Sequence, residues 1–483
     1  MTVSSATGES DLMMIGNRIE RLWNYLGKPH SASLAFMVAG SVWFMIGSLY
    51  GLVSAIDLVA PDLFQNIPFL TFGRSRPVHV NAVLFGFVTS TLFGAGFYYL
   101  PALLRTKLWS ERLGWLTFLF WNIGVTSAPI TFGYGMSQGR EYAELIWIFD
   151  IFIELALLMG LANLLMTLFR REENQLYVAV WYFIGTFLWT SGVYFIGNVM
   201  WNPPSGALPG LVDSVVLWFY GHNLPGLLMT PLAVGAAYFI IPRVTKTPLF
   251  SHKLSLLGFW LLVVLYTHIG GHHTLQAPIP NWLKVVSVTH SVGMALPVVI
   301  VLINLWMTAR GHGGALLKDP AGRMVIFGTI WYLVVSLQGS LQSTFFLQRV
   351  THFNNWTVGH AHIAVLGFVG FIALGALWHI LPMAARCRLY SQRLVNLQFG
   401  LLMFGLTGFF VVLTTAGLIQ GHAWYSGETV YRVLNQISIY MILRAALGIS
   451  IIIASGLGLY NIFMTLYRAE PPEGGVKEED YAL

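Results

Sequence analysis

The stretch Leu265–His273, LYTHIGGHH, places two adjacent histidines at the end of an otherwise apolar segment. An earlier apolar segment carries His222 in the stretch WFYGHN, and a later one carries His360 and His362 in the stretch WTVGHAH. A histidine inside a bilayer is costly unless it pairs with another group or binds a ligand. Five histidines in three such segments therefore predict a buried centre that holds a metal ion and haem.

The composition around these histidines is that of a membrane protein. Of the 483 residues, 56% are hydrophobic and only 10% are charged, whereas about a quarter of the residues in a soluble protein are charged. Twelve apolar stretches are long enough to cross a bilayer, which takes roughly 20 residues of α-helix. We therefore expect an all-α integral membrane protein with twelve transmembrane helices. Their expected starts lie near Ser33, Val78, Leu113, Leu145, Tyr177, Asp213, Lys253, Lys284, Met324, Trp356, Val395 and Gln436.

The formal net charge of +6 could indicate an anionic partner such as nucleic acid, but the positions of the basic residues argue against it. With the twelve spans in place, nineteen lysines and arginines fall on the side of the N-terminus and six on the other, leaving out Arg444 inside the last span. Basic residues concentrate on the cytoplasmic side of membrane proteins. We therefore predict that both chain ends are cytoplasmic and that the excess charge reflects topology.

We expect one helical membrane domain, at residues 33–468, between two polar cytoplasmic tails at 1–32 and 469–483, the second of them disordered. We expect no cleaved signal peptide, and no internal repeat is evident. The single cysteine, Cys387, excludes an internal disulfide, a thiolate metal cluster and the C-x-x-C-H attachment of a c-type haem. Covalently bound haem would therefore belong to another subunit.

The predicted topology brings six histidines to the same depth, in the outer half of the membrane. Independent scatter would rarely produce this, so a prosthetic group in that layer is the economical explanation. The six are His79 and His222 on the second and sixth spans, His272 and His273 on the seventh, and His360 and His362 on the tenth. In contrast, His268, His290 and His379 are more simply interpreted as histidines that hydrogen-bond to a neighbouring helix.

Helical spacing refines this prediction. At about 100° per residue, His360 and His362 point about 200° apart, so that they can face two different flat cofactors. His272 and His273 are about 100° apart, and both can approach one metal ion together with His222. Three imidazoles suit copper, zinc or iron and leave a coordination position open. Tyr266, about 9 Å further along the same helix toward the cytoplasm, could equally be a packing residue.

With these residues in view, the chain resembles the catalytic subunit of the C-family haem-copper oxygen reductases, the cbb3-type cytochrome c oxidases. The resemblance runs from about residue 33 to residue 468. Five motifs carry it in order, and the ordered set is highly specific: FGRSRPVH at 72–79, GREYAE at 139–144, WFYGHN at 218–223, LYTHIGGHH at 265–273 and HFNNWTVGHAH at 352–362.

The resemblance implies a role for each histidine. His79 and His362 would be the axial ligands of a low-spin b-type haem, and His360 the proximal ligand of a high-spin haem. A copper ion facing that haem would be held by the remaining three: His222, His272 and His273. Tyr266 matches the tyrosine that in this family is linked covalently to the histidine of the sixth span and supplies an electron and a proton during O–O cleavage.

The resemblance also implies roles nearer the surfaces. Arg74, Arg76 and His352 would bind haem propionates, since guanidinium groups pair well with carboxylates, although the two arginines could be ordinary interfacial anchors. Glu141 matches a ligand of a calcium ion that bridges the propionates. Hydroxyls that match the family's single proton channel belong to Tyr238 and Ser255, together with Tyr266, although hydroxyls also pack between membrane helices.

One position departs from the family pattern. The ninth span of the family usually carries a glutamate in a pattern such as F-E-G-P, whereas this chain reads LQGS, with Gln338 at that place. An ionisable group near the haem centre is therefore missing. Glu154, in the fourth span, could compensate for it, or could pair with polar neighbours as Asp150 could.

The expected function is a terminal respiratory oxidase that reduces O2 to water and couples this to proton uptake and translocation across the bacterial inner membrane. Electrons would come from cytochrome c through cytochrome c-bearing partner subunits. A nitric oxide reductase is the nearest alternative: it shares the six histidines but holds non-haem iron with a carboxylate four residues after the histidine of the sixth span, where this chain has Gly226. A secondary transporter would not explain the H-x-H pair.

Overall fold

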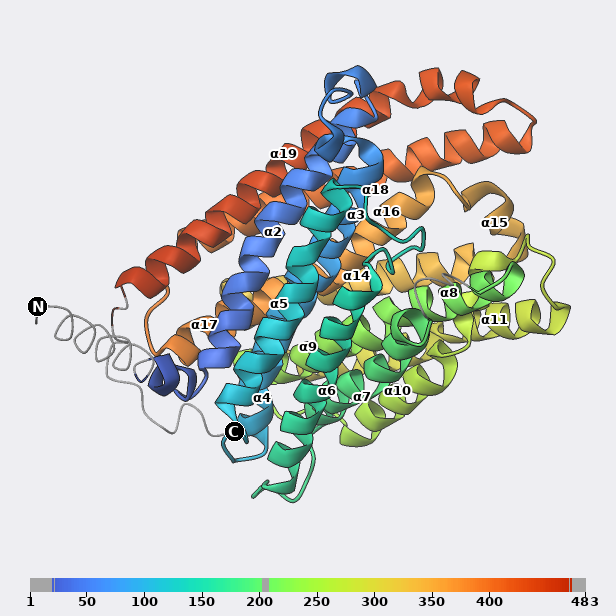
Figure 1. Ribbon diagram of the computed structural model, residues 1–483. Helices are drawn as coiled ribbons and strands as arrows, with labels where there is room; N and C mark the ends of the chain where they lie inside the picture. Colours follow the sequence, from blue (N-terminus) through green and yellow to red (C-terminus); the bar gives the residue numbers. More distant parts are fainter. Residues whose placement is uncertain (1–19, 21, 202–207, 469, 471–483) are drawn as a thin grey trace, which may run out of the picture.

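The computed structural model describes residues 20, 22–201, 208–468 and 470 (Figure 1). The two predicted tails lie largely outside these residues, so their cytoplasmic position and the disorder of the second tail stay predictions. Among the described residues, twelve helical segments are long and apolar enough to cross a membrane, which confirms the expected number. In the described part of the chain there is no strand, so the all-α prediction is also confirmed.

Several of the twelve spans are interrupted by short π- or 3₁₀-segments, labelled η. In chain order the spans are α2 (Ser31–Asp57); α3 (Phe72–Asn81), η3 (Ala82–Thr89) and α4 (Ser90–Leu103); α5 (Glu111–Gly133); α6 (Trp147–Phe169); α7 (Val178–Tyr194) and η4 (Phe195–Val199); α8 (Leu211–Leu224), η5 (Pro225–Met229) and α9 (Thr230–Thr245); α10 (His252–Tyr266) and η6 (Ile269–Thr274); α11 (Asn281–Gly293) and α12 (Ala295–Thr308); α14 (Pro320–Gln342); α16 (Asn355–His362), η7 (Ile363–Gly370) and α17 (Phe371–Ala385); α18 (Gln392–Tyr425); and α19 (Val430–Arg468). The connections contain η1 (Pro61–Leu63), η2 (Pro68–Leu70), α13 (Gly313–Lys318) and α15 (Phe345–Thr351).

The helix boundaries differ from the expected starts by at most six residues, the largest differences being at the second and twelfth spans. The second span was expected to begin at Val78, its first strongly apolar residue, whereas α3 begins at Phe72. The residues in between include Arg74 and Arg76, which are polar but form helix readily. Hydropathy therefore marks the apolar part of a span, and the helix continues beyond it.

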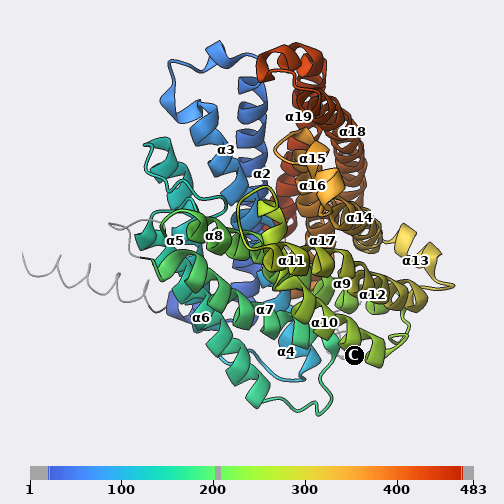
Figure 2. The same cartoon turned by 90° about the vertical axis from the view of Figure 1, so that its right-hand side faces the viewer.

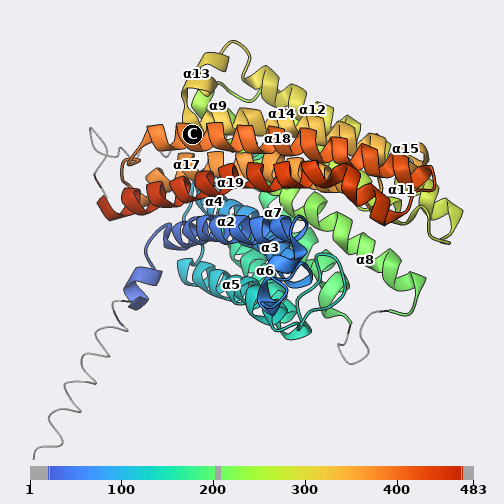
Figure 3. The same cartoon turned by 90° about the horizontal axis from the view of Figure 1, so that it is seen from above.

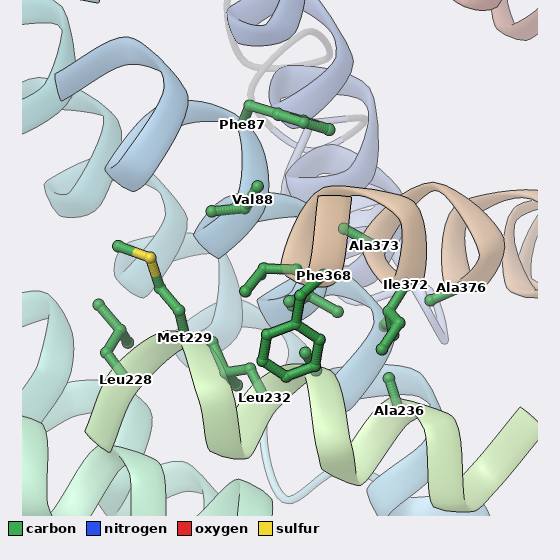
Figure 4. Close-up of a cluster of buried hydrophobic side chains, with 14 of the residues drawn as sticks. Phe87, Val88, Leu228, Met229, Leu232, Ala236, Phe368, Ile372, Ala373 and Ala376 are labelled. Carbon is green, nitrogen blue, oxygen red and sulfur yellow. The ribbon is translucent and has the colours of Figure 1, made fainter. Parts of the chain in front are cut away.

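Spans two, six and ten form the centre of the bundle. Their apolar windows are 89%, 94% and 83% buried, whereas no other span exceeds 61%. Figure 4 shows their side chains meeting, with Phe87 and Val88 from the second span, Leu228 to Ala236 from the sixth and Phe368 to Ala376 from the tenth. These are the spans that carry His79, His222 and the H-x-H pair. The outer spans surround them, and α18 and α19 lie side by side along one flank (Figures 2 and 3).

Three equivalent hydrogen-bonded clasps tie the chain together at the face where α2 begins, which we call the N-side face. In the first clasp, the backbone N–H of Ser110 donates to Oδ1 of Asn163 at 3.0 Å, and Asn163 Nδ2 donates to the Ser110 carbonyl at 2.8 Å. The N–H of Trp109 donates to Thr167 Oγ1 at 2.9 Å. The amide of the buried Asn163 thus joins the start of α5 to the last part of α6.

The same bonds recur twice along the chain. The second clasp joins Phe250 and Ser251 to Asn304 and Thr308, and the third joins Tyr390 and Ser391 to Asn461 and Thr465. The three serines are spaced 141 and 140 residues apart, and each accepts a hydrogen bond from the N–H three residues later. The expectation of no internal repeat is therefore wrong for the described part of the chain, where the same set of hydrogen bonds recurs every four spans.

Candidate haem and metal centre

In each central span, a histidine lies three residues before a π-segment. The segments η3, η5 and η7 begin three residues after His79, His222 and His360 respectively. A π-turn holds one more residue than an α-turn and is frequent at functional sites. Side-chain hydrogen bonds follow this wider turn, since Thr89 Oγ1 donates to the Leu84 carbonyl five residues back at 2.7 Å. The extra residue changes the direction of the histidine relative to the rest of its span.

His222, His272 and His273 form a group whose ligand atoms all lie within 4.8 Å of one another. Within the described residues it is the one group of three or more histidine, cysteine or acidic side chains close enough to share an ion. His222 Nδ1 and His273 Nε2 are 2.9 Å apart. Two imidazole nitrogens on one ion, each at about 2.0–2.1 Å from it, lie roughly 3 Å apart. The three imidazoles therefore fit a shared metal ion.

The local geometry that brings His272 and His273 together differs from the expected continuous α-helix. Helix α10 ends at Tyr266, and the two histidines lie in the 3₁₀-segment η6. A Cβ atom on Gly270 would be 2.2 Å from the carbonyl oxygen of Trp218, so glycine permits η6 to approach α8 this closely. The His273 ring consequently stacks on Trp218, with centroids 3.9 Å apart and planes 9° apart.

Ser291 on α11 determines which nitrogen of His272 is free. The Ser291 hydroxyl donates its single proton to the Ser287 carbonyl at 2.7 Å. It therefore accepts at its contact with His272 Nδ1, also at 2.7 Å. The proton of the neutral imidazole lies on Nδ1, and the lone pair of Nε2 is available to a metal ion. A partner of this kind commonly fixes both the tautomer and the ring orientation of a metal-binding histidine.

His79 and His362 face one another across the second and tenth spans. Their ring centroids are 6.3 Å apart and their planes differ by 22°. An iron ion bound at about 2.0–2.1 Å from Nε2 of each ring would separate the centroids by roughly 6 Å, so the pair fits a six-coordinate haem iron. Both Nδ1 atoms contact backbone carbonyls at 2.7 Å, those of Gly47 and Val358. Each Nδ1 therefore carries the proton and leaves Nε2 free.

His360 faces the other side of α16, as its spacing from His362 predicted. Its Nδ1 lies 3.0 Å from Oε1 of Gln338 on α14. A Cβ atom on Gly339 would come within 3.2 Å of its Cε1, so α14 packs closely against the ring. His360 is also near enough to His222 and His272 to interact electrostatically with both. The sequence-predicted ligands therefore gather into two neighbouring sites.

Tyr266 lies beside the three-histidine group and not merely on the surface of a helix. Its ring stacks on that of His222, with centroids 5.2 Å apart and planes 19° apart. The ring occupies the space over Gly226, where a Cβ atom would be only 1.6 Å from Tyr266 Cε1. No side chain larger than hydrogen fits at position 226 while Tyr266 holds this position.

The residues expected near haem propionates and calcium lie at the face opposite the N-side face. Arg74 donates to the carbonyl of Gly133 at 2.6 Å, and Arg76 forms an ion pair with Glu141 at 2.6 Å. The Glu141 carboxylate therefore already has a cationic partner, and it belongs to no group of three acidic or histidine ligands in the described chain. His352 contacts Oε1 of Gln276 through Nδ1 at 3.1 Å.

Sequence reasoning missed Arg444, which was set aside as a charge inside the last span. Its guanidinium interacts electrostatically with His79, His362 and Arg76, and among the described residues no carboxylate forms an ion pair with it. A cation within a membrane span calls for an anionic partner. Arg444 and Arg76, next to the His79–His362 pair, fit the carboxylates of a haem. The signal in the sequence was the charge itself, in an otherwise apolar span.

The predicted proton-pathway residues lie apart from the histidines, toward the N-side face. Tyr238 is buried on α9, and its hydroxyl accepts from Nδ2 of Asn304 at 3.3 Å. Ser255 is buried on α10 and donates to the His252 carbonyl at 2.7 Å. Asn304, which sequence reasoning did not select, thus contacts the pathway and the second clasp. Glu154 is buried on α6, and its Oε2 makes no hydrogen bond within the described chain.

Glu144, in the connection between α5 and α6, gives a testable pH dependence. Burial, and then repulsion by Glu141, raise the pKa of its carboxyl from 4.5 to about 7, despite a hydrogen bond from Asn81. The folded protein thus binds this proton more tightly than the unfolded chain, and the stabilisation is lost as the pH rises from 4.5 through 7. We expect Glu144→Gln to stabilise the protein at pH 8 by up to about 3 kcal/mol and to have little effect near pH 4.5.

Thermal unfolding midpoints of the detergent-solubilised protein at pH 5 and pH 8 measure this effect. Glu428, in the turn between α18 and α19, supplies the control, since Glu428→Gln removes a carboxylate at the surface whose one cationic partner is the exposed Arg432, 3.5 Å away. An equal change of the midpoint with pH in the wild type and in Glu144→Gln would contradict the expectation.

The chain is similar to known oxidase subunits over most of its length. Residues 31–450 match the family model described as "Cytochrome C and Quinol oxidase polypeptide I". The "Cytochrome c oxidase subunit 1 homolog" of Agrobacterium tumefaciens (strain T37) is 31% identical over 91% of this chain and 84% of its own length. The "Cbb3-type cytochrome c oxidase subunit CcoN1" of Stutzerimonas stutzeri is 29% identical over 91% of this chain and 95% of its own length.

A solved structure shares the fold. It is a cryo-EM structure of a heme-copper terminal oxidase dimer, with a TM-score of 0.77 over 93% of this chain and 86% of that chain. At 16% sequence identity, the likeness concerns the arrangement of the helices alone.

Proposed function

Because the chain belongs to the family of the cytochrome c and quinol oxidase polypeptide I, as its motifs predicted, we propose that it is the catalytic subunit of a cbb3-type cytochrome c oxidase. It reduces O2 to water with electrons from cytochrome c, which arrive through cytochrome c-bearing subunits of the same complex. The protein crosses the bacterial inner membrane twelve times, with both chain ends in the cytoplasm. The similarity to a cbb3-type subunit over most of both chains supports the choice of this subfamily.

The observation that carries the proposal is the contact of Tyr266 with Gly226 and His222. A nitric oxide reductase needs a carboxylate four residues after the histidine of the sixth span, at position 226. The Tyr266 ring fills that position, because a Cβ atom there would lie 1.6 Å from Cε1. The site therefore favours copper held by three imidazoles over non-haem iron held by a carboxylate, and it favours O2 over nitric oxide as the substrate.

The histidines have distinct roles in this proposal. His79 and His362 would hold a low-spin b-type haem, and His360 would hold a high-spin haem. His222, His272 and His273 would hold a copper ion. When bound, the two haems and the copper ion supply the electrons and the site at which O2 is reduced.

The chain's own groups supply protons and fix geometry. Tyr266 presents its hydroxyl beside His222 and provides a proton and an electron during O–O cleavage, so that no partially reduced product is released. Protons come from the cytoplasm past Tyr238 and Ser255, where buried hydroxyls lie between the N-side face and the site. This uptake, together with proton translocation, makes turnover electrogenic.

Groups near the opposite face bind the haem carboxylates. Arg74, Arg76 and His352 take this role, and we add Arg444 because it lies next to the low-spin pair without a carboxylate partner among the described residues. Glu141 is proposed as a calcium ligand, which would require its ion pair with Arg76 to open or to be shared with the ion.

Metal analysis of the purified complex tests the proposed function. Copper and non-haem iron are counted against b-type haem by elemental analysis and by the pyridine haemochrome assay. We expect one copper per two b-type haems in this subunit and no further iron. One non-haem iron without copper would identify a nitric oxide reductase, and a preparation without haem and without copper would overturn the redox assignment.

A further inference from the structure

Gln338 differs in kind from the other groups that contact the Nδ1 atoms of the three histidines proposed to bind haem. For His79 and His362, the acceptor at Nδ1 is a backbone carbonyl, at 2.7 Å in each case. For His360 the acceptor is a side chain, Oε1 of Gln338 at 3.0 Å. Among the three histidines proposed to bind haem, His360 is therefore the one whose hydrogen-bond acceptor would change if a single side chain, that of residue 338, were substituted.

The direction of this hydrogen bond follows from the roles of the two groups. The Oε1 atom of an amide accepts and has no proton to give, so the His360 Nδ1–H donates and Nε2 keeps its lone pair. An amide is also uncharged and does not take the proton from the imidazole. A carboxylate in the same place would draw the proton toward itself and give the imidazole partly anionic character, which makes it a stronger donor to iron.

The segment around Gln338 is built to hold this contact in place. Gln338 is 9% exposed, and Gly339 permits the close approach of α14 to the His360 ring. Ser340 donates from Oγ to the carbonyl of Ser291 at 3.0 Å. The Ser291 hydroxyl in turn accepts from His272 Nδ1 at 2.7 Å. Gln338 and Gly339 therefore contact His360 directly, and Ser340 is linked to His272 through Ser291.

We propose that Gln338 is a positioning residue that keeps the His360 imidazole neutral and thereby sets the reduction potential of the high-spin haem above the value a carboxylate would give. The inference rests on the proposed function, since it needs haem iron on His360. The hydrogen bond to the axial ligand is one of the ways in which a protein adjusts a haem potential. A carboxylate stabilises the oxidised iron through a more electron-rich imidazole, whereas a neutral amide does so less.

The experiment compares Gln338→Glu and Gln338→Leu in the purified complex. Redox titration gives the midpoint potential of the high-spin haem, and resonance Raman spectroscopy of the reduced form gives the iron–histidine stretching frequency. We expect Gln338→Glu to lower the potential by at least 59 mV, a tenfold change in the one-electron equilibrium constant, and to raise the stretching frequency. Gln338→Leu, which removes the acceptor, should shift both quantities in the opposite direction.

Gln342→Glu is the matched control, because Gln342 lies one turn further along α14 and accepts from Trp356 Nε1 at 2.8 Å, away from His360. It should leave both quantities unchanged. Wild-type values in both Gln338 variants, with haems and copper fully present, would overturn the inference while the proposed function stands. If Gln338→Glu does not assemble, an unshifted Gln338→Leu still overturns it. A wild-type complex without haem or copper would overturn the proposed function instead.

Discussion

Tyr266→Phe is expected to lower the rate of oxygen reduction at least about a hundredfold while both haems and the copper ion remain bound. The phenylalanine ring keeps the stacking on His222 and still covers Gly226, so the packing of the site is preserved. What is lost is the hydroxyl group. Proton transfer by a positioned side chain contributes about 10²–10⁴-fold to a rate, and Tyr266 also supplies an electron in the proposed mechanism.

Oxygen consumption with reduced cytochrome c measures this effect, and elemental analysis with haem quantification confirms that the site is loaded. Tyr99→Phe is a suitable control, because Tyr99 is a buried tyrosine of the second span whose hydroxyl makes no hydrogen bond in the described chain. It should turn over at close to the wild-type rate. Near-normal turnover in Tyr266→Phe would show that the hydroxyl has no part in the reaction.

The second large effect concerns the two histidines on opposite faces of α16. His362→Ala should remove the low-spin haem and leave the high-spin haem in place, and His360→Ala should do the reverse. In each case the other haem keeps its own ligand, because His362 faces His79 at 6.3 Å between ring centroids while His360 faces α14. Turnover should be lost in both variants, since electrons need the first haem and oxygen needs the second.

Visible and electron paramagnetic resonance spectra distinguish low-spin from high-spin iron and measure this reciprocal loss. His379→Ala provides the control: His379 lies further along the same span, on α17, and its ring contacts Phe239. Both haems should remain in that variant. Loss of the same haem from His360→Ala and His362→Ala would contradict the assignment of the two faces.

The sequence predicted the twelve spans and the grouping of three histidines because each depends on a strong local signal. Apolar runs of the required length define the spans, and the cost of histidine in a membrane singles out His222, His272 and His273. The opposite directions of His360 and His362 follow from helical geometry alone. These features need no knowledge of what lies on neighbouring helices.

Features that depend on neighbouring helices were not predicted. The 3₁₀ form of η6 arises because Gly270 lets the chain approach Trp218, and no spacing rule within one helix indicates this contact. The tautomer of His272 depends on Ser291, a residue of ordinary type on another span. The repeat was missed because its clasps consist of a few polar residues, such as Asn163 and Thr167, within long apolar sequences.

The three clasps also have a consequence for how this architecture can diversify. They all lie at the N-side face, where Asn163, Asn304 and Asn461 tie neighbouring spans together, whereas the six histidines lie in the opposite half of the bundle. Structural support and chemistry are thus separated by depth. Substitutions in the half that holds the histidines leave these hydrogen bonds in place, so the residues of the site can change without loss of the contacts that join neighbouring spans.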